Sequence, residues 1–131
     1  MLVKLKAFTG IELETVNAAA DFYTKLLQNV KTPLVPDGFY SSWAQYTIQL
    51  KSREQRDMLQ ATLKEKGIPT MVYYPKPMHR QAAFAAHTYD DADFPVTNRL
   101  CDTVLSLPMH PYLNMGDALD VANEINGRLS E

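Results

Sequence analysis

Five side chains capable of polar chemistry lie on one short stretch of this sequence, residues 74–81. Together they supply a phenol, an ammonium, an imidazole, a guanidinium and an amide: Tyr74, Lys76, His79, Arg80 and Gln81. Pro75 and Pro77 each fix φ at about −65° and bias the preceding residue toward extended backbone. We therefore expect a stiff loop that presents hydrogen-bonding groups to a polar ligand.

His79 is the first candidate for a ligand contact. An imidazole can donate a hydrogen bond to a phosphate or a sugar hydroxyl, and it changes charge near neutral pH. Alternatively, it is an exposed loop imidazole that satisfies a local carbonyl. Arg80 and Lys76 fit a diphosphate, since arginine offers a bidentate fork and lysine a point charge, although two solvated loop cations are the alternative. Only one of Tyr73 and Tyr74 can point to the ligand if the backbone is extended, and Tyr73 is the expected core residue.

The other reactive side chains indicate structural roles. His110 stands between Pro108 and Pro111, so we expect its ring to pack against a neighbouring loop. The three histidines lack metal-ligand spacing, and Cys101 has no nearby cysteine or histidine, which favours a small core residue. The sequence therefore predicts no catalytic residue, no cofactor-binding residue and no metal ligand within this chain.

Helical periodicity predicts a first helix over residues 10–28, begun by a capping box of Thr9 and Glu12. Residues 41–50 then alternate apolar and polar side chains, which predicts a strand buried on one face. Trp43 falls on the opposite face, where we expect a boundary aromatic that packs under a loop.

The second half of the chain contains similar signals. Ser52 begins a second helix that ends at Gly67, and residues 68–73 follow as a short strand. Residues 82–93 lack periodicity and are expected to form a mobile or ligand-covering loop. The last three elements are a helix that starts at Pro95, a strand, and a helix capped by Asn114: residues 95–102, 103–107 and 114–129. Three strands among amphipathic helices predict an α/β (α+β) two-layer sandwich.

Composition limits the function classes. The 131 residues fit one domain, and 46% hydrophobic with 21% charged residues is ordinary for a soluble globular protein. A net charge of −2 gives no basic field for nucleic acid or an anionic membrane, and no apolar run approaches the roughly 20 residues that span a bilayer. The single cysteine allows no intramolecular disulfide and is consistent with a cytoplasmic location.

Three motifs carry a family resemblance: YYPKPMHRQ at residues 73–81, FPVTNRL at 94–100 and LSLPMHPYL at 105–113. From about Lys4 to its end, the chain resembles the C-terminal small domain of the DegT/DnrJ-type nucleotide-sugar aminotransferases, which depend on pyridoxal phosphate (PLP). Family members often carry leucine where Met78 stands, a volume-conserving change.

The resemblance implies that residues 1–131 are a single domain, with a small three-stranded, mainly antiparallel sheet covered on one face by helices. It implies that the PLP-bearing large domain is absent from these residues. The family reaction moves an amino group, expected from glutamate, to a keto-sugar nucleotide in the synthesis of lipopolysaccharide, O-antigen or another polysaccharide. The resemblance implies that this loop reaches across a homodimer interface and that His79 contacts the substrate or lies beside it, with Tyr74, Lys76, Arg80 and Gln81 as neighbours on the loop.

None of the eight lysines lies in a segment that resembles the PLP-lysine motif. We therefore expect this chain alone to bind no PLP and to be catalytically silent. Two hypotheses remain open. The chain is the aminotransferase domain that supplies substrate and dimer contacts, with the large domain as its partner, or it is a free-standing, non-catalytic binding or interaction domain.

Overall fold

The computed structural model describes residues 2–130. Its main elements are α1 (Leu2–Ala7), a π-helical turn (Phe8–Glu12), α2 (Leu13–Leu26), β1 (Tyr46–Gln49), α3 (Arg53–Glu65), α4 (Pro95–Thr103), β2 (Val104–Leu107) and α5 (Met115–Leu129). Three short 3₁₀-helices lie between α3 and α4, at Met78–Arg80, Ala82–Phe84 and Asp91–Asp93. Within residues 2–130, no helix combines the length and the apolar character needed to cross a bilayer.

The first helix begins earlier than predicted. Helical backbone runs without interruption from α1 through the π-helical turn into α2. The capping box at Thr9 is therefore wrong, because Thr9 lies inside the helix and its hydroxyl donates to the carbonyl of Leu5 at 3.0 Å. The preceding leucine, lysine and alanine residues are good helix formers, and a threonine within a helix commonly bonds back to the residue four positions earlier.

Glu12 joins this helix to a distant loop. Its buried carboxylate accepts hydrogen bonds from Lys4 Nζ at 2.6 Å and from the Tyr112 hydroxyl at 2.5 Å. The hydrogen bonds from Lys4 and Tyr112 lower the pKa of Glu12. Residue 12 therefore does not cap the helix but fastens it to the loop before α5.

The two strands form a short antiparallel sheet. Tyr46 pairs with Leu107 and Gln49 with Val104. The strand predicted over residues 41–50 is regular only in β1, because the chain before it turns at Trp43, where φ is +45°. The Trp43 ring lies 5.5 Å from that of Tyr46. Its Nε1 donates to Asn17 at 2.9 Å, as expected for a boundary aromatic.

The predicted third strand is wrong as a regular element. Residues 68–73 contribute only one isolated bridge, in which Met71 pairs with Ser106 through hydrogen bonds of 2.7 and 3.1 Å. Pro69 and Pro75 flank this bridge, and a proline cannot donate a hydrogen bond to the ladder. The sheet therefore has two strands, with a one-residue bridge beside β2 at Met71 and another beside β1, where Lys31 pairs with Gln49.

The helix boundaries in the second half follow the predicted caps. Ser52 Oγ accepts from the Gln55 amide at 3.2 Å at the start of α3. At its end, Gly67 adopts a φ of +75° and the Ile68 amide donates to the Leu63 carbonyl at 2.9 Å, which is a Schellman motif. Asn114 Oδ1 accepts from the Gly116 amide at 2.8 Å at the start of α5.

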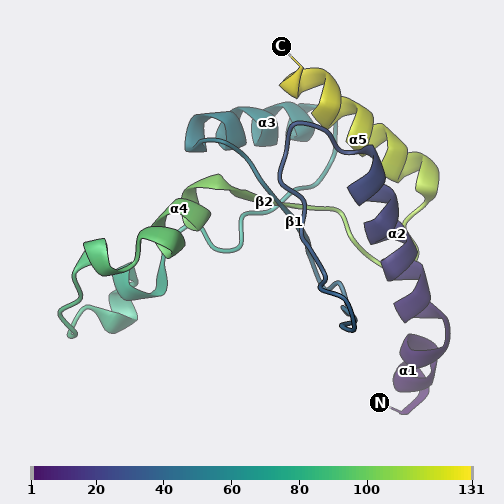
Figure 1. Ribbon diagram of the computed structural model, residues 1–131, viewed down its shortest axis with the longest axis horizontal. Helices are drawn as coiled ribbons and strands as arrows, with labels where there is room; N and C mark the ends of the chain where they lie inside the picture. Colours follow the sequence, from purple (N-terminus) through teal and green to yellow (C-terminus); the bar gives the residue numbers. More distant parts are fainter. Residues whose placement is uncertain (1, 131) are drawn as a thin grey trace.

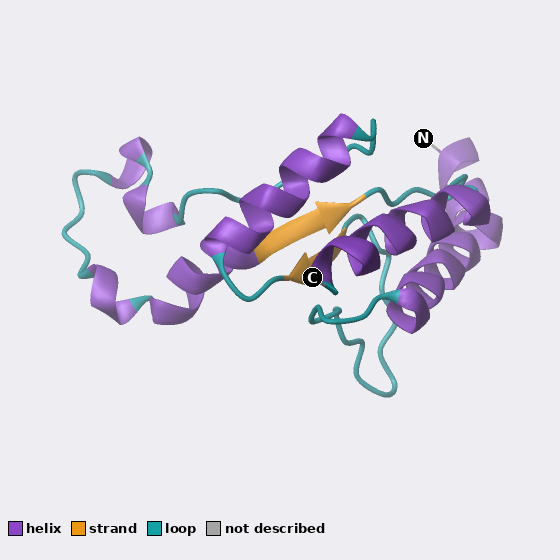
Figure 2. Ribbon diagram, turned by 90° about the horizontal axis from the view of Figure 1, so that it is seen from above, coloured by secondary structure: helices purple, strands orange, loops and turns teal. Residues whose placement is uncertain are grey.

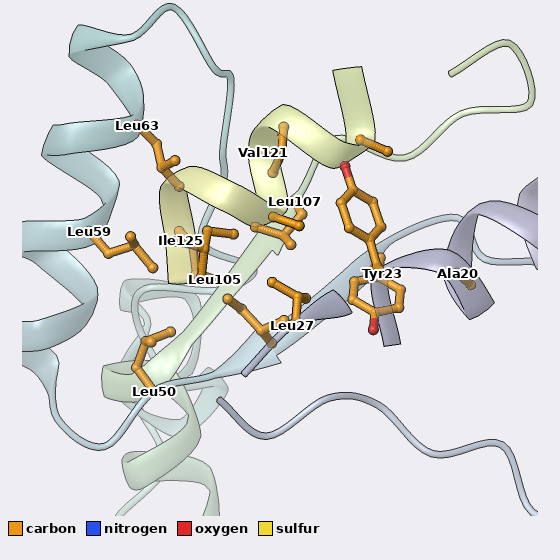
Figure 3. Packing of buried hydrophobic residues seen from close by; sticks show 14 residues of the cluster. Ala20, Tyr23, Leu27, Leu50, Leu59, Leu63, Leu105, Leu107, Val121 and Ile125 are labelled. Atoms are coloured by element: carbon orange, nitrogen blue, oxygen red, sulfur yellow. The ribbon is translucent and has the colours of Figure 1, made fainter. Parts of the chain in front are cut away.

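Helices α2, α3 and α5 cover one face of the sheet (Figures 1 and 2). Alternate strand residues point into this layer and meet side chains from all three helices (Figure 3). Among the largest fully buried side chains are Tyr23, Tyr46, Ile48, Leu59, Leu63, Leu105 and Ile125. Burial raises the pKa of Tyr23 to about 12. The two-layer sandwich is thus confirmed, with its core between the sheet and the helices.

Residues 73–102 project from this body as an arm, seen beside α4 in Figure 1. The arm comprises the proline loop, the three 3₁₀-helices and nearly all of α4. Within it Pro77 alone is buried as a whole residue, although the side chain of His79 is also largely covered. The prediction that Tyr73 is a core residue is wrong, since Tyr73 is 41% exposed and Tyr74 68% exposed. Cys101, near the base of the arm, is partly buried rather than in the core.

Candidate ligand-binding site

Two of the predicted site residues meet at a carboxylate in the arm. Asp91 Oδ1 lies 2.8 Å from His79 Nε2 and accepts a hydrogen bond from Arg80 Nε at 2.5 Å. Arg80 Nη2 donates to the other oxygen of Asp91. The guanidinium fork that the sequence suggested for a diphosphate is therefore engaged by a side chain of the same arm.

Local structure holds this carboxylate in place from both sides. The 3₁₀-turn Met78–Arg80 directs His79 and Arg80 toward the same group. Asp90 caps the following turn by accepting from the Ala92 amide at 2.9 Å. From the first turn of α4, Asn98 Nδ2 donates to the Asp91 carbonyl at 2.9 Å and to its Oδ2 at 3.1 Å.

The cluster is electrostatically balanced. The pKa of Asp91 is lowered to about 2, chiefly by the hydrogen bonds from Arg80 and, to a smaller extent, by the hydrogen bond with His79. The hydrogen bond with Asp91 likewise raises the pKa of Arg80. Asp91 is therefore an ionised acceptor throughout the physiological pH range.

His79 does not satisfy a local carbonyl, the alternative that the sequence left open, because its ring partner is the Asp91 carboxylate. Its side chain is only 8% exposed, and its ring stacks on that of Phe94 at 4.5 Å with an interplanar angle of 19°. It borders an aromatic hollow of about 350 Å³, lined by Met78, His79, Phe84, Tyr89, Phe94 and Thr97. The imidazole thus lies between an ionised partner and an apolar surface that could accept a ring.

The other predicted residues lie on the outer part of the same loop. Tyr74 and Lys76 are exposed, and Gln81 Nε2 donates to the Lys76 carbonyl at 3.4 Å. These residues are close to His79 in sequence, but none of them joins His79, Arg80 and Asn98 in contact with the Asp91 carboxylate. Tyr73, at the base of the loop, borders a second hollow of about 390 Å³ whose lining includes Ser106 and His110.

His110, which we expect to pack against a neighbouring loop, is exposed and borders a hollow together with Pro69 and Thr70 of the segment after α3. Its backbone carbonyl accepts a turn hydrogen bond from the Leu113 amide at 3.1 Å. Among the described residues, no group of three or more histidine, cysteine or acidic side chains could hold a metal ion.

Sequence reasoning missed three polar residues that shape this region. Asp91 and Asn98 lie beyond the proline loop, and Arg56 is buried on α3 although its neighbours are polar. Arg56 Nη1 donates to the carbonyls of Cys101 at 3.2 Å and Val104 at 3.3 Å. Arg56 therefore fixes the end of α4, and with it the base of the arm, to the body.

Comparison with known proteins relates nearly the whole chain to one family of aminotransferases. Residues 1–126 match the family model of the DegT/DnrJ/EryC1/StrS aminotransferases. UDP-2-acetamido-2-deoxy-3-oxo-D-glucuronate aminotransferase of Pseudomonas aeruginosa is 37% identical over 115 residues, which are 87% of this chain and 30% of that protein. The pleiotropic regulatory protein of Geobacillus stearothermophilus is 46% identical over 96 residues, 70% of this chain and 25% of that protein.

A solved structure agrees with these matches. A DegT DnrJ EryC1 StrS aminotransferase from Brucella abortus superposes with a TM-score of 0.88 at 37% identity, over 99% of this chain and 34% of that one. The chain therefore spans between 25% and 34% of the length of these three proteins.

Proposed function

The chain belongs to the DegT/DnrJ/EryC1/StrS aminotransferase family, and from that premise we propose that residues 1–131 form the C-terminal small domain of a PLP-dependent nucleotide-sugar aminotransferase. Its relatives include nucleotide-sugar aminotransferases, and it spans about a third of the related Brucella abortus chain. In this proposal the complete enzyme is a cytoplasmic homodimer that moves an amino group from glutamate to a keto-sugar nucleotide. The product enters lipopolysaccharide, O-antigen or another polysaccharide.

The cofactor belongs to the large domain in this proposal. Enzymes of this family use PLP, which supplies an electron sink for amino-group transfer. A Schiff-base lysine is normally activated by desolvation or by a neighbouring cation. All eight lysines of this chain are exposed, and none borders the aromatic hollow. The residues present do not fit PLP, so we assign the chain no step of the cofactor chemistry.

The arm supplies the substrate contacts. The observation that carries this assignment is the position of His79, held by Asp91 and Phe94 at the edge of an open aromatic hollow. Tyr74, Lys76, Arg80 and Gln81 lie on the same loop and belong to the proposed substrate contacts, although none of them lines the hollow and Arg80 is engaged by Asp91. Because His79 is already held by Asp91 and Phe94, little further ordering of its side chain is needed on binding, which favours affinity.

A domain-replacement chimera tests this function. In the Pseudomonas aeruginosa relative, the 115 matched residues are replaced by the corresponding part of this chain. We expect the chimera to bind PLP and to aminate a UDP- or dTDP-linked keto-sugar with glutamate as donor. His79→Ala should weaken sugar-nucleotide binding by about 1–3 kcal/mol, as when a buried hydrogen bond is left unmade.

The matched control is His87→Ala, at an exposed histidine outside the aspartate cluster. It should leave the Michaelis constant and turnover unchanged. A folded, PLP-bearing chimera that transfers no amino group to any of these sugars would contradict the proposal.

A second function is favoured by one comparison. The Geobacillus stearothermophilus relative at 46% identity is named a pleiotropic regulatory protein rather than an aminotransferase. The alternative is therefore a non-catalytic binding or interaction domain with the same fold. It predicts an inactive chimera, and sugar-nucleotide binding that His79→Ala leaves unchanged.

A further inference from the structure

The contact between His79 and Asp91 determines which ring nitrogen is available to a ligand. Asp91 is an acceptor that lies 2.8 Å from Nε2. A neutral imidazole carries its proton on one nitrogen, and a carboxylate beside Nε2 favours the proton there. Nδ1 then keeps its lone pair and becomes the hydrogen-bond acceptor of the ring.

The ring and the carboxylate are both held in place. Stacking on Phe94 at 4.5 Å sets the plane of the imidazole, which is 8% exposed. Arg80 engages both oxygens of Asp91, and Asn98 Nδ2 adds a further hydrogen bond at 3.1 Å. The positive charge of Arg80 compensates the charge of Asp91, so the carboxylate acts on His79 mainly as a directed acceptor.

We propose that Asp91 is a positioning residue, which holds His79 in the Nε2–H tautomer so that Nδ1 accepts a hydrogen bond from a sugar hydroxyl. The sugar hydroxyl rests on the proposed function, whereas the tautomer does not. The geometry also gives Arg80 a supporting role, because two of its donor groups, Nε and Nη2, fix the carboxylate. Specificity at this position is then for a hydroxyl donor rather than for a phosphate oxygen, which has no proton to give.

The tautomer is measurable in the ligand-free chain. Long-range proton–nitrogen NMR spectra of the imidazole rings, recorded at about pH 8 where free imidazole is neutral, should show His79 protonated at Nε2 alone. His79→Gln assigns the signal among the three histidines. Asp91→Ala should convert His79 to a mixture of both tautomers, whereas Asp93→Ala, at an exposed residue of the same 3₁₀-helix, should change nothing.

Asp91→Asn is the conservative variant. An amide oxygen can accept from Nε2–H, so this variant should restore the single tautomer if acceptance is what matters. Restoration by Asn also separates positioning from local unfolding of the arm in the alanine variant. A His79 protonated at Nδ1, or one whose tautomer is the same with and without Asp91, would overturn the inference.

The chimera provides the second readout. Asp91→Ala should raise the Michaelis constant for the sugar nucleotide by roughly 5- to 100-fold, and Asp91→Asn should restore most of it. An inactive chimera together with an Asp91-dependent tautomer would refute the proposed function and still support Asp91 as the residue that positions His79. An active chimera that is indifferent to Asp91→Ala would overturn the positioning role alone.

Discussion

The body and the arm of this molecule are held together by different forces. The body buries a continuous apolar cluster drawn from both strands and from α2, α3 and α5. The arm, residues 73–102, buries little besides Pro77 and the side chain of His79, and it depends on the hydrogen bonds to Asp91 and on the His79–Phe94 stack. Apolar burial is non-directional, whereas hydrogen bonds fix direction. The region that we propose to orient polar groups toward a ligand is thus the region built from polar contacts.

The difference extends to how the two regions depend on each other. The arm leaves the body after the Met71–Ser106 bridge and returns at the end of α4, where Arg56 binds two carbonyls. With so little apolar surface buried, the arm cannot be stable by itself. Damage to the body should therefore unfold both regions, and damage to the arm should leave the body folded.

The largest effect is expected from the core. Leu105 is fully buried in β2 beneath the helices, and Leu105→Ala should lower the free energy of unfolding by about 2–5 kcal/mol because it leaves a cavity. Urea denaturation followed by circular dichroism measures this change. Amide exchange should show that body and arm lose protection together.

Val96→Ala is the matched control, since Val96 is 56% exposed on α4. Its effect should stay within about 0.5 kcal/mol, as for other surface substitutions. Equal losses for Leu105→Ala and Val96→Ala would mean that the core does not carry the stability assigned to it.

A smaller effect is expected at the junction. Arg56→Met keeps the apolar length of the side chain but leaves the carbonyls of Cys101 and Val104 without their donor. The free energy of unfolding should fall by about 1–3 kcal/mol, the cost of unsatisfied buried polar groups. Amide exchange at the end of α4 should rise more than in the core of α5.

Arg53→Met provides the comparison, since Arg53 is 59% exposed and pairs with Asp102 at 3.3 Å. An exposed pair of this kind contributes about 1 kcal/mol at most. If the two variants lose the same stability, Arg56 does not join arm and body in the way its contacts indicate.

Local signals explain which parts of the fold could be predicted. Ser52, Gly67, Pro95 and Asn114 act on their own helix ends, so their sequence context is sufficient. The capping signature at Thr9 failed because the residues before it already form a helix. The third strand failed because strand pairing depends on residues far apart in the chain, here Met71 and Ser106.

The site shows the same limit. The motif places His79 and Arg80 together, but it does not reveal that Asp91, 12 residues after His79, binds both. The acidic run of residues 90–93 after a histidine–arginine pair was the available signal, and spacing alone could not select one carboxylate. Arg56 was missed because burial of a charged side chain depends on distant carbonyls that accept from it.

The smallest effect is the pH dependence of the arm. The folded arm lowers the pKa of Asp91 from its ordinary value of 3.8 to about 2, chiefly through the hydrogen bond from Arg80. A carboxylate with a lowered pKa stabilises the folded arm fully above about pH 4, and this contribution is lost as pH falls from there toward 2. The effect should be small because Asp91 is about half exposed and solvent screens its charge.

NMR spectroscopy measures this titration. The carboxyl carbon resonance of Asp91 should titrate near pH 2, and the ring resonances of Phe94 should shift in the same range as the stack on His79 loosens. Arg80→Met removes the main cause, so the midpoint should move upward toward 3.8 while the core resonances of Leu105 stay in place. A wild-type midpoint near 3.8 would show that Asp91 is not held by Arg80 and His79 in solution, and the distinction between a polar arm and an apolar body would then lose its main support.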